Sequence, residues 1–426
     1  MRTLIIGNSA SAVGAIESMR QHDQTAEILL ITAEPSLIYS RPLLSHYLSG
    51  EIDEARLAYR HADFYTQHGV NAVLNSEVVA IEPQAHRVRT ALGETYAYDK
   101  LLICTGGMPI VPPVPGIDTP GVFTFTRLAD VRGILEYMQS RPVRDVVVVG
   151  GGMIGIKATD ALVACGLHVT MVELAPRILS ASFDEIASNM VANIFRQGGV
   201  DVYTENTVTK VLSEQGHVAS VELKDGRVLP CDLLILGIGV RPNVRIAQEA
   251  GIQVNRGIVV DEYMRTSEPD IYAAGDVAEA YDLVVDMNRT VAIWPNAYRQ
   301  GAIGGAHIVG VARADRGGVA MNTIEALGVP AMTIGNANAT EKEGYEVLSE
   351  LNERELTYRR LVVKDNLLVG VILVRNINRA GIYTGLIRNK IPLGDTRKSL
   401  LHERLSLLSL PDNYRKHVVT GMGIEV

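Results

Sequence analysis

Residues 145–155 read D-V-V-V-V-G-G-G-M-I-G, an apolar strand that runs directly into a glycine-rich turn. The glycines have the spacing G-x-G-x-x-G (Gly150, Gly152 and Gly155). They permit a tight turn, a close approach of the backbone to a pyrophosphate, and close packing of a helix on the strand. A helical pattern follows, and then a second apolar strand that ends at Glu173. This stretch predicts a strand-helix-strand unit that binds a dinucleotide.

Glu173 bears on which nicotinamide cofactor this unit takes. A carboxylate at the end of the second strand accepts hydrogen bonds from the 2′-hydroxyl of NADH and repels the 2′-phosphate of NADPH. NADH is therefore expected rather than NADPH. Arg177 leaves alternatives open, because its guanidinium could accept a phosphate, form a salt bridge or stack on adenine.

The N-terminus repeats the same architecture with a weaker motif. Residues 3–32 run from an apolar stretch through a helical pattern to a second apolar stretch. The turn reads G-x-S-x-x-A, with Gly7, Ser9 and Ala12 at the three decisive positions. Gly7 permits the tight turn, and the other two residues are small enough for a pyrophosphate and for close helix packing. Because Glu34 follows the second strand, a second dinucleotide site is predicted here.

Bulk properties restrict the class of protein. The 426 residues suffice for two or three domains, and a hydrophobic content of 47% suits a packed globular chain. A net charge of -8 argues against nucleic acid as a main partner. No apolar run reaches the roughly 20 residues of a membrane helix, so a cytoplasmic protein is expected. The three cysteines lack the spacing of a disulfide framework or a metal site, and no metal is expected.

The order of the expected elements predicts an α/β fold with two Rossmann-like domains and a small α+β domain. Five prolines in residues 109–120 mark a junction. The first nucleotide-binding domain is assigned to residues 1–115 and 245–320, and the second, inserted into it, to residues 116–244. Short strands and helices, including a helix at 396–405, are expected in a third domain over residues 321–426.

Three further motifs suggest a family. Residues 266–276 read T-S-E-P-D-I-Y-A-A-G-D, residues 104–107 read C-T-G-G, and residues 237–243 read G-I-G-V-R-P-N. Together with the two turns, they resemble the pyridine nucleotide-disulfide oxidoreductase superfamily over residues 1–320. The resemblance implies FAD on the first fold, NADH on the second, and direct electron transfer from nicotinamide to flavin without a protein base.

The resemblance also assigns cofactor contacts to individual residues. The FAD contacts that it implies are Gly7, Ser9, Ala12, Glu34, Arg41, Pro42, Val79, Thr105, Gly106, Arg127, Gly275, Asp276, Trp294 and Ala297. The NADH contacts that it implies are Gly150, Gly152, Ile154, Gly155, Glu173, Arg177, Gly237, Ile238 and Gly239. Structural alternatives stay open for some of them: a surface loop for Arg41 and Pro42, an ion pair between domains for Arg127, and simple packing for Trp294.

Residues 39–45, Y-S-R-P-L-L-S, distinguish branches of the superfamily. At this position in the sequence, disulfide-reducing members carry a C-x-x-x-x-C pair of cysteines, whereas NADH oxidases and peroxidases carry a single cysteine. This chain has neither, so thiol chemistry is not expected. The run is similar instead to NADH-rubredoxin reductases, the flavin part of nitrite reductases and FAD subunits of larger complexes. His46 and Lys157 replace a lysine and a glutamate of many relatives, and each is either catalytic at the cofactors or structural.

The charge distribution bears on the partner. Residues 359–426 carry 12 Lys or Arg against 5 Asp or Glu, a net charge of +7 in an acidic chain. This basic segment could dock an acidic iron-sulfur protein or rubredoxin, or pack on its own acidic domains or a second copy of the chain. Electrons could pass from NADH through the flavin to the partner. In an aldehyde or 2-oxoacid oxidoreductase complex they could instead pass from the partner through the flavin to NAD. The alternative function is a flavin-containing NADH sensor or scaffold. Residues 407–426 lack periodicity and are predicted to order against a partner subunit.

Overall fold

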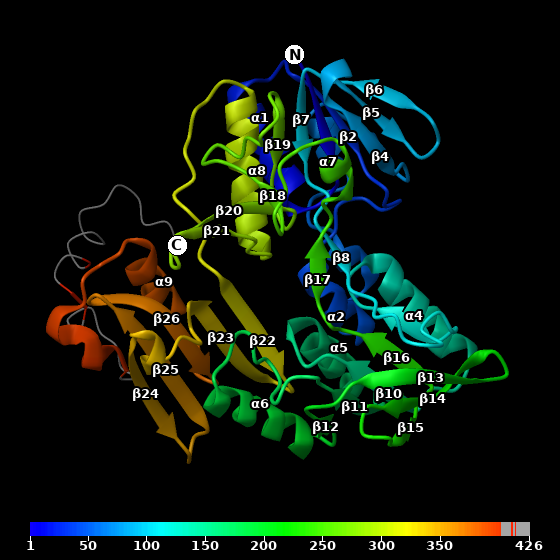
Figure 1. The fold of residues 1–426 in the computed structure, drawn as a ribbon, viewed down its shortest axis with the longest axis vertical. Coiled ribbons are helices and arrows are strands. Elements are labelled where there is room, and N and C mark those ends of the chain that lie inside the picture. Colours follow the sequence, from blue (N-terminus) through cyan, green and yellow to red (C-terminus); the bar gives the residue numbers. More distant parts are fainter. Residues whose placement is uncertain (402–409, 412–413, 415–426) are drawn as a thin grey trace. The chain divides into compact units, whose positions relative to one another are not determined.

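The computed structural model describes residues 1–401, 410, 411 and 414 (Figure 1). Nearly all of the tail predicted at 407–426 lies outside the described residues. The chain divides into two compact units, which are treated separately below. Unit 1 comprises Met1–Ile110, Thr126–Leu128 and Val240–Val319, and unit 2 comprises Val111–Phe125, Ala129–Gly239 and Ala320–Val426. The three domain ranges expected from the sequence stay a prediction.

Unit 1 is built on a five-stranded parallel sheet. Its strand order is β19-β7-β1-β2-β3, with the bounds Ile271–Ala273, Lys100–Ile103, Arg2–Ile6, Glu27–Ile31 and Val70–Val73. Parallel neighbours need a crossover connection, and helix α1 (Ala10–His22) supplies it between β1 and β2. Helix α8 (Trp294–Ile308) packs beside α1 (Figure 1). The strand-helix-strand unit predicted at the N-terminus is thereby confirmed.

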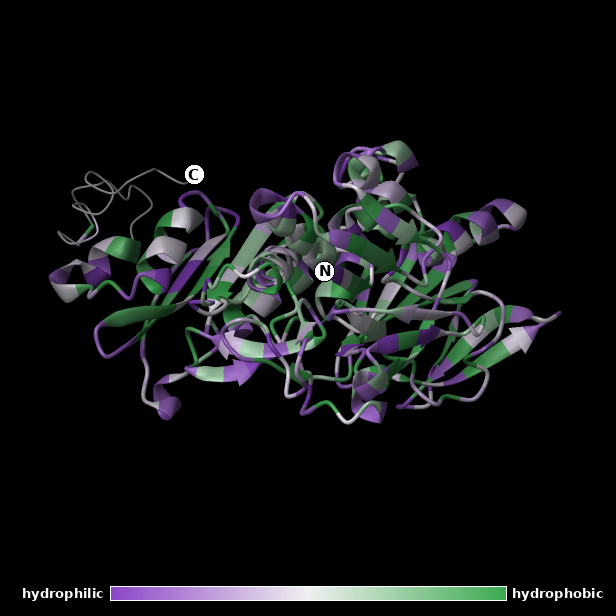
Figure 2. Cartoon of the chain, turned by 90° about the horizontal axis from the view of Figure 1, so that it is seen from above, coloured by the Kyte–Doolittle hydropathy of each residue, from purple (hydrophilic) through white to green (hydrophobic). Residues whose placement is uncertain are grey.

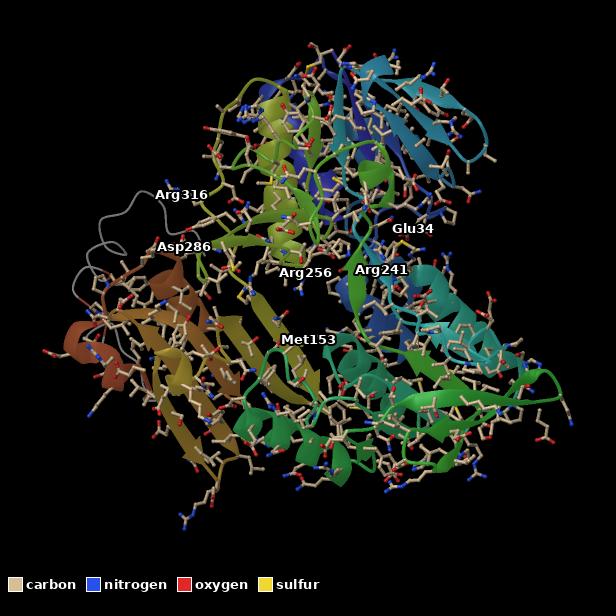
Figure 3. All side chains as sticks on the ribbon, viewed as in Figure 1. Glu34, Met153, Arg241, Arg256, Asp286 and Arg316 are labelled. Carbon is tan, nitrogen blue, oxygen red and sulfur yellow. The ribbon has the colours of Figure 1, made fainter. Side chains whose placement is uncertain are left out.

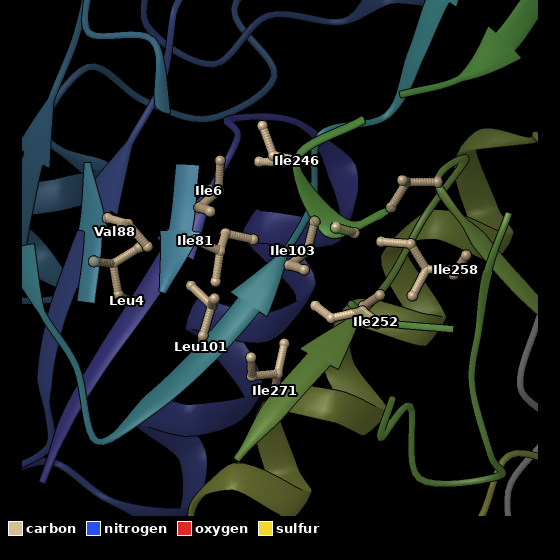
Figure 4. Close-up of a cluster of buried hydrophobic side chains, with 14 of the residues drawn as sticks. Leu4, Ile6, Ile81, Val88, Leu101, Ile103, Ile246, Ile252, Ile258 and Ile271 are labelled. Carbon is tan, nitrogen blue, oxygen red and sulfur yellow. The ribbon is translucent and has the colours of Figure 1, made fainter. Parts of the chain in front are cut away.

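Apolar side chains on the strands of this sheet alternate between its two faces, as a period of two residues requires. In β1, Ile5 belongs to the cluster that includes α1, whereas Leu4 and Ile6 belong to a second cluster. Figure 4 shows the second cluster, where Val88 and Ile246 join them. Val88 lies on β5 (Arg87–Thr90), which pairs with the antiparallel strands β4 (Val78–Glu82) and β6 (Thr95–Ala97). Ile246 lies on helix α7 (Arg245–Glu249).

Shorter elements complete unit 1. Strands β8 (Gly107–Pro109) and β17 (Val240–Pro242) pair with each other. A second small sheet contains β18 (Ile258–Val259), β20 (Ala278–Asp282) and β21 (Met287–Arg289). The short helices are η1 (Arg41–Leu43), α2 (Leu44–Leu48), η2 (Glu54–Leu57), α3 (Phe64–Gln67) and η3 (Pro83–Ala85).

Unit 2 repeats the parallel architecture. Its sheet has the order β12-β11-β10-β16-β9, with the bounds Asp201–Tyr203, His168–Val172, Asp145–Val149, Leu233–Leu236 and Val122–Thr124. The helices are α4 (Leu128–Ser140), α5 (Met153–Ala164) and α6 (Glu185–Gln197), and a meander contains β13 (Val208–Glu214), β14 (His217–Leu223) and β15 (Val228–Pro230). In both sheets the first strand of the strand-helix-strand unit is central, which confirms the duplication predicted from the sequence.

The C-terminal part of unit 2 is an antiparallel sheet. Its order is β22-β23-β26-β25-β24, with the bounds Met321–Ala326, Val329–Gly335, Leu367–Val374, Thr357–Lys364 and Glu346–Asn352. Strands β25 and β26 are buried along most of their length, and Figure 2 shows the hydropathy of their residues. The η4 turn (Glu341–Glu343) and helix α9 (Ala380–Arg388) accompany the sheet. The helix expected at 396–405 is a 3₁₀ helix, η5 (Gly394–Leu401), as far as the described residues reach.

A buried ionic cluster joins this sheet to helix α6. Asp184 caps α6 by accepting a hydrogen bond from the Ala187 N–H (3.0 Å). Its other carboxylate oxygen accepts from the Tyr358 hydroxyl (2.5 Å) and from Arg360 Nη1 (2.7 Å). The side chains of Asp184 and Arg360 are only 9% and 10% exposed. Because both charges are paired and hydrogen-bonded, the cluster fixes the sheet on the helix, and removal of one partner would leave a buried charge unpaired.

Tyr358→Phe is expected to lower the free energy of unfolding of unit 2 by about 2 kcal/mol, because it removes a buried hydrogen bond to a charged carboxylate. Chemical denaturation followed by far-UV circular dichroism measures the change. Tyr281→Phe is the matched control, since the Tyr281 hydroxyl also donates to a carboxylate, Asp286 (2.6 Å), but at the exposed surface. Equal effects of the two substitutions would contradict a special contribution of the buried cluster.

Candidate dinucleotide-binding sites

The phosphate turn of unit 1 lies between β1 and α1. Gly7 has a φ of +111°, and a Cβ atom there would lie 2.2 Å from the Cys104 carbonyl oxygen. Ser9 is the N-cap of α1, but its side chain makes no capping hydrogen bond. The first N–H groups of α1 are thus left for an anion, which a pyrophosphate can supply. Ala12 is fully buried and allows the close packing predicted from the sequence.

The loop after β19 brings a second polar group to unit 1. Gly275 donates its N–H to Gln300 Oε1 (2.9 Å), and its φ is +86°. No hydrogen-bond partner meets the neighbouring Asp276 carboxylate within the part of the chain that the structure describes. Burial raises the pKa of Asp276, and the charge of Arg41 opposes that shift. A half-buried carboxylate to which no described side chain donates fits a ligand that brings hydroxyl groups, as FAD does.

Glu34, beyond the end of β2, is held by two side chains. Arg41 Nη2 contacts one carboxylate oxygen, and the Tyr39 hydroxyl donates to the other at 2.7 Å. Arg41 Nη1 also donates to the Thr126 carbonyl (2.9 Å). The Arg41 guanidinium is therefore tied to two segments, and its contact with FAD stays a prediction beside the surface-loop alternative. Arg127, next to Thr126, is half-buried, and its contact with FAD stays a prediction.

The remaining residues predicted for FAD lie in three parts of unit 1. Thr105 and Gly106 form hydrogen bonds with Asn243, which follows β17. Thr105 Oγ1 donates to the Asn243 carbonyl (2.8 Å), and the Asn243 N–H donates to the Gly106 carbonyl (2.9 Å). Trp294 and Ala297 lie in the first turn of α8, and the Trp294 ring meets the Tyr59 ring edge-on at 4.9 Å. Packing thus accounts for part of the Trp294 environment. Val79 is half-buried on β4 and Pro42 is exposed in η1, and their contacts with FAD stay predictions.

The phosphate turn of unit 2 is more tightly built. Gly150 has a φ of +106°, and a Cβ atom at Gly155 would lie 1.7 Å from the Gly150 carbonyl oxygen. Gly152 caps α5 without a side chain, and a Cβ atom there would meet nothing within 4 Å. Met153, labelled in Figure 3, and the half-buried Ile154 begin the helix. Open space in front of uncapped N–H groups fits the pyrophosphate of NADH.

Both oxygens of Glu173 are fixed by the backbone. The carboxylate accepts hydrogen bonds from the Gly151 N–H (2.5 Å) and the Ala175 N–H (2.7 Å). It is therefore held beside the phosphate turn, in the place predicted for the ribose of NADH. Arg177 Nη2 lies 3.5 Å from the Phe183 carbonyl oxygen, and its buried Nε has no partner among the described residues. The choice between phosphate binding, a salt bridge and stacking stays open for Arg177.

The loop after β16 approaches the same turn. A Cβ atom at Gly237 would lie 2.8 Å from the Gly155 Cα atom, whereas Gly239, with a φ of +108°, faces open space. Ile238 between them is half-buried. The structure thus brings this loop together with the glycine-rich turn, as a nicotinamide-binding edge requires.

The two residues predicted to be catalytic lie in different units. Lys157 is half-buried on α5; burial lowers the pKa of Lys157, although Asp160 and Glu325 act in the opposite direction. His46 lies on α2, where its Nδ1 is 2.6 Å from Glu51 Oε2. This contact lies at the surface, and whether His46 acts at the cofactors or is structural stays untested.

None of the three cysteines, which all lie within the described residues, forms a disulfide, and Cys104 and Cys231 are buried. Burial raises the pKa of Cys104 to about 12, although a hydrogen bond with Ser11 opposes the shift. A neutral, buried thiol is a poor nucleophile. Cys104→Ala is therefore expected to change the rate of flavin reduction by NADH by no more than about threefold, because no thiol takes part. Anaerobic stopped-flow absorbance measures the rate, and a loss of more than tenfold would contradict this expectation.

Comparison with known proteins identifies the fold that carries these sites. The model of the pyridine nucleotide-disulphide oxidoreductases matches residues 1–301. The chain belongs to this family. The model of the rubredoxin NAD⁺ reductase C-terminal domain matches residues 321–391. Members of the family are FAD- and NAD(H)-dependent oxidoreductases, and the two turns, Glu34 and Glu173 fit those cofactors.

This chain covers nearly the whole length of some relatives and only about half the length of others. It is 30% identical over 410 residues to the epsilon subunit of NADH-dependent phenylglyoxylate dehydrogenase from Aromatoleum evansii, covering 95% of each chain. It is 28% identical to a nitrite reductase of Bacillus subtilis over 95% of its own length but only 49% of that protein. The reductase in a covalent putidaredoxin reductase–putidaredoxin complex superposes with a TM-score of 0.87 and 26% identity, over 94% of this chain and 96% of that one.

Sequence reasoning missed the contacts of two residues beside the predicted FAD site, Tyr39 and Tyr65. Tyr39 holds Glu34, and the Tyr65 hydroxyl donates to Asn8 Oδ1 (2.5 Å) in the phosphate turn. The Y-S-R-P run contained Tyr39, but a local motif does not show which distant group a hydroxyl meets.

None of the helices in the described residues is both long and apolar enough to span a membrane.

Proposed function

We propose that this chain is the FAD- and NADH-binding component of an oxidoreductase that exchanges electrons with an iron-sulfur protein or rubredoxin. The observation that carries the proposal is the near-complete overlap, in both directions, with one subunit of an NADH-dependent dehydrogenase. The absence of any cysteine in the Y-S-R-P-L-L-S segment supports it, because this segment then offers no disulfide or sulfenic acid that the flavin could reduce. A match to the C-terminal domain of rubredoxin NAD⁺ reductase supports a protein acceptor.

The residues of the chain supply binding and orientation. Bound FAD supplies the chemistry, since it accepts two electrons from NADH and releases them singly. The first turns of α1 and α5 hold the pyrophosphates, while Glu34 and Glu173 accept hydrogen bonds from the riboses. Three reduced cysteines and the use of NADH support a cytoplasmic site of action.

The partner is proposed to dock on a basic surface around α9. Arg375, Arg379, Arg388 and Lys390 are exposed before, within and after this helix. An acidic iron-sulfur protein or rubredoxin would be attracted by this surface at long range, so the rate of association would fall as salt rises. Packing on a second copy of the chain is the competing explanation.

A charge reversal tests this docking surface. Arg388→Glu with Lys390→Glu is expected to raise the KM for an acidic [2Fe-2S] ferredoxin roughly tenfold at low salt, with kcat for ferricyanide unchanged. Lys210→Glu, an exposed site on β13, is the control for a change of net charge. Unchanged KM values in the double variant, or a change of oligomeric state in its place, would refute docking at α9.

Anaerobic stopped-flow kinetics test the function as a whole. NADH should bleach the flavin absorbance, and ferredoxin or rubredoxin should restore it over many turnovers. Reduced ferredoxin with NAD⁺ measures the reverse direction. A long-lived reduced state that no iron-sulfur protein reoxidises would favour the NADH sensor and would refute the reductase.

Lys157 and His46 are proposed to act at the cofactors. Lys157 follows the phosphate turn by one helical turn, where its ammonium could bind the nicotinamide amide or favour an anionic reduced flavin. Lys157→Met should then raise the KM for NADH or shift the flavin potential, whereas His46→Ala should change the pH profile of flavin reduction. Unchanged NADH kinetics, potential and pH profile would leave both residues with structural roles alone.

A further inference from the structure

Residues 126–128 form a short strap that returns to unit 1 between two stretches of unit 2. Two side chains of the FAD site hold it. Arg41 Nη1 donates to the Thr126 carbonyl (2.9 Å), and the Leu128 N–H donates to the Tyr39 hydroxyl (3.1 Å). The same two side chains hold the Glu34 carboxylate. The strap and the ribose-binding carboxylate therefore belong to one hydrogen-bond network.

The phenol of Tyr39 is suited to the centre of this network. Its side chain is buried, with 6% exposure, and burial raises the pKa of Tyr39 far above its ordinary range, so the hydroxyl stays a neutral donor. One hydroxyl can donate one hydrogen bond and still accept another, and Tyr39 does both. The Arg41 guanidinium lies over the Tyr39 ring, with Cζ 5.2 Å from the ring centroid.

The network leaves Glu34 able to bind a ligand. An ionised carboxylate has about four acceptor positions, of which Arg41 and Tyr39 use two. Its side chain is 25% exposed, so the remaining positions are reachable. A ribose that brings two hydroxyl groups would complete the set.

We infer that Tyr39 is a positioning residue that holds residues 126–128 and Glu34 in place for the adenosine half of FAD. The hydrogen bonds of Tyr39 and Arg41 to the strap and to Glu34 are called the clasp. The clasp has one consequence for binding: the carboxylate is fixed before FAD arrives, so less freedom is lost when FAD binds. This consequence rests on the proposed binding of FAD in unit 1, and it follows whichever protein receives the electrons.

The affinity of the protein for FAD tests the clasp. Tyr39→Phe is expected to raise the dissociation constant of FAD roughly tenfold, the size of one charge-assisted hydrogen bond. Quenching of flavin fluorescence on titration of the stripped protein measures the constant. The KM for NADH should not change, since its site belongs to unit 2.

Tyr98→Phe is the matched control. Tyr98 is buried in the same unit, but its hydroxyl has no partner among the described residues. If both substitutions weaken FAD binding equally, or if Tyr39→Phe leaves it within twofold, the clasp is refuted.

A double-mutant cycle separates positioning from a general loss of structure. In a Glu34→Gln background, Tyr39→Phe should weaken FAD binding further by less than twofold, because its effect passes through the carboxylate. Fully additive effects would refute action through Glu34. If Tyr39→Phe does not yield folded protein, Arg41→Lys replaces it, since a lysine cannot bridge the strap and Glu34 with two separate donors.

Discussion

Gly301→Ala is expected to cost unit 1 about 3 kcal/mol of stability and most of its bound FAD, because helices α1 and α8 touch backbone to backbone. A Cβ atom at Gly301 would lie 1.9 Å from the Ser11 carbonyl oxygen. Gly14 and Gly305 make similar approaches, at 2.1 Å to the Tyr298 carbonyl oxygen and 2.5 Å to the Ala15 carbonyl oxygen. An added methyl group would have to displace backbone, since no flexible side chain lies in its way.

The loss of FAD follows from where the displaced backbone lies. Ser11 is in the first turn of α1, whose N–H groups face the pyrophosphate position. Chemical denaturation followed by fluorescence of Trp294, the single tryptophan, reports on unit 1, and flavin absorbance reports on occupancy. Gly304→Ala is the matched control, because it lies on the same helix and a Cβ atom there would make only ordinary contacts, the nearest at 3.4 Å from Met264 Cβ. Stability unchanged by Gly301→Ala would show that the helices do not pack as closely as described.

The elements that the sequence predicted well share one property, which is that their signals are local. The turn at Gly150 is bounded by an apolar strand and a helical pattern, and all three parts lie within a few residues of one another. Glu173 and Glu34 were found because each follows the second strand of such a unit. The place of β9 in the second sheet was not predicted, since pairing with β16 joins segments far apart in the chain.

The missed features depend on pairs of distant side chains. Asp184 and Arg360 form a buried pair across 176 positions of sequence, and no local pattern connects the two residues. Arg41 was assigned to FAD by resemblance, but its bond to Thr126 and the return of residues 126–128 to unit 1 were not foreseen. Such contacts are set by how sheets and helices pack, which composition and periodicity do not encode.

The preference for NADH over NADPH is expected to fall roughly 10- to 100-fold in Glu173→Gln, because the amide keeps the shape of the side chain but loses its charge. In the native protein, each oxygen of the Glu173 carboxylate accepts one hydrogen bond, from the N–H groups of Gly151 and Ala175. An amide has one acceptor oxygen, so one of the two N–H groups loses its partner. Repulsion of a 2′-phosphate disappears at the same time, so the positive charge of Arg177, four residues later, attracts that phosphate unopposed.

The ratio of kcat/KM for the two cofactors measures this change, with ferricyanide as an acceptor that needs no docking surface. Glu214→Gln is the matched control, since it removes the same charge from an exposed position on β13 of the same unit. The NADH value should fall and the NADPH value should rise, because a hydrogen bond is lost for one cofactor and a repulsion for the other. If both values fell by the same factor, Glu173 would act on binding in general, and the choice between NADH and NADPH would have to be made elsewhere in unit 2.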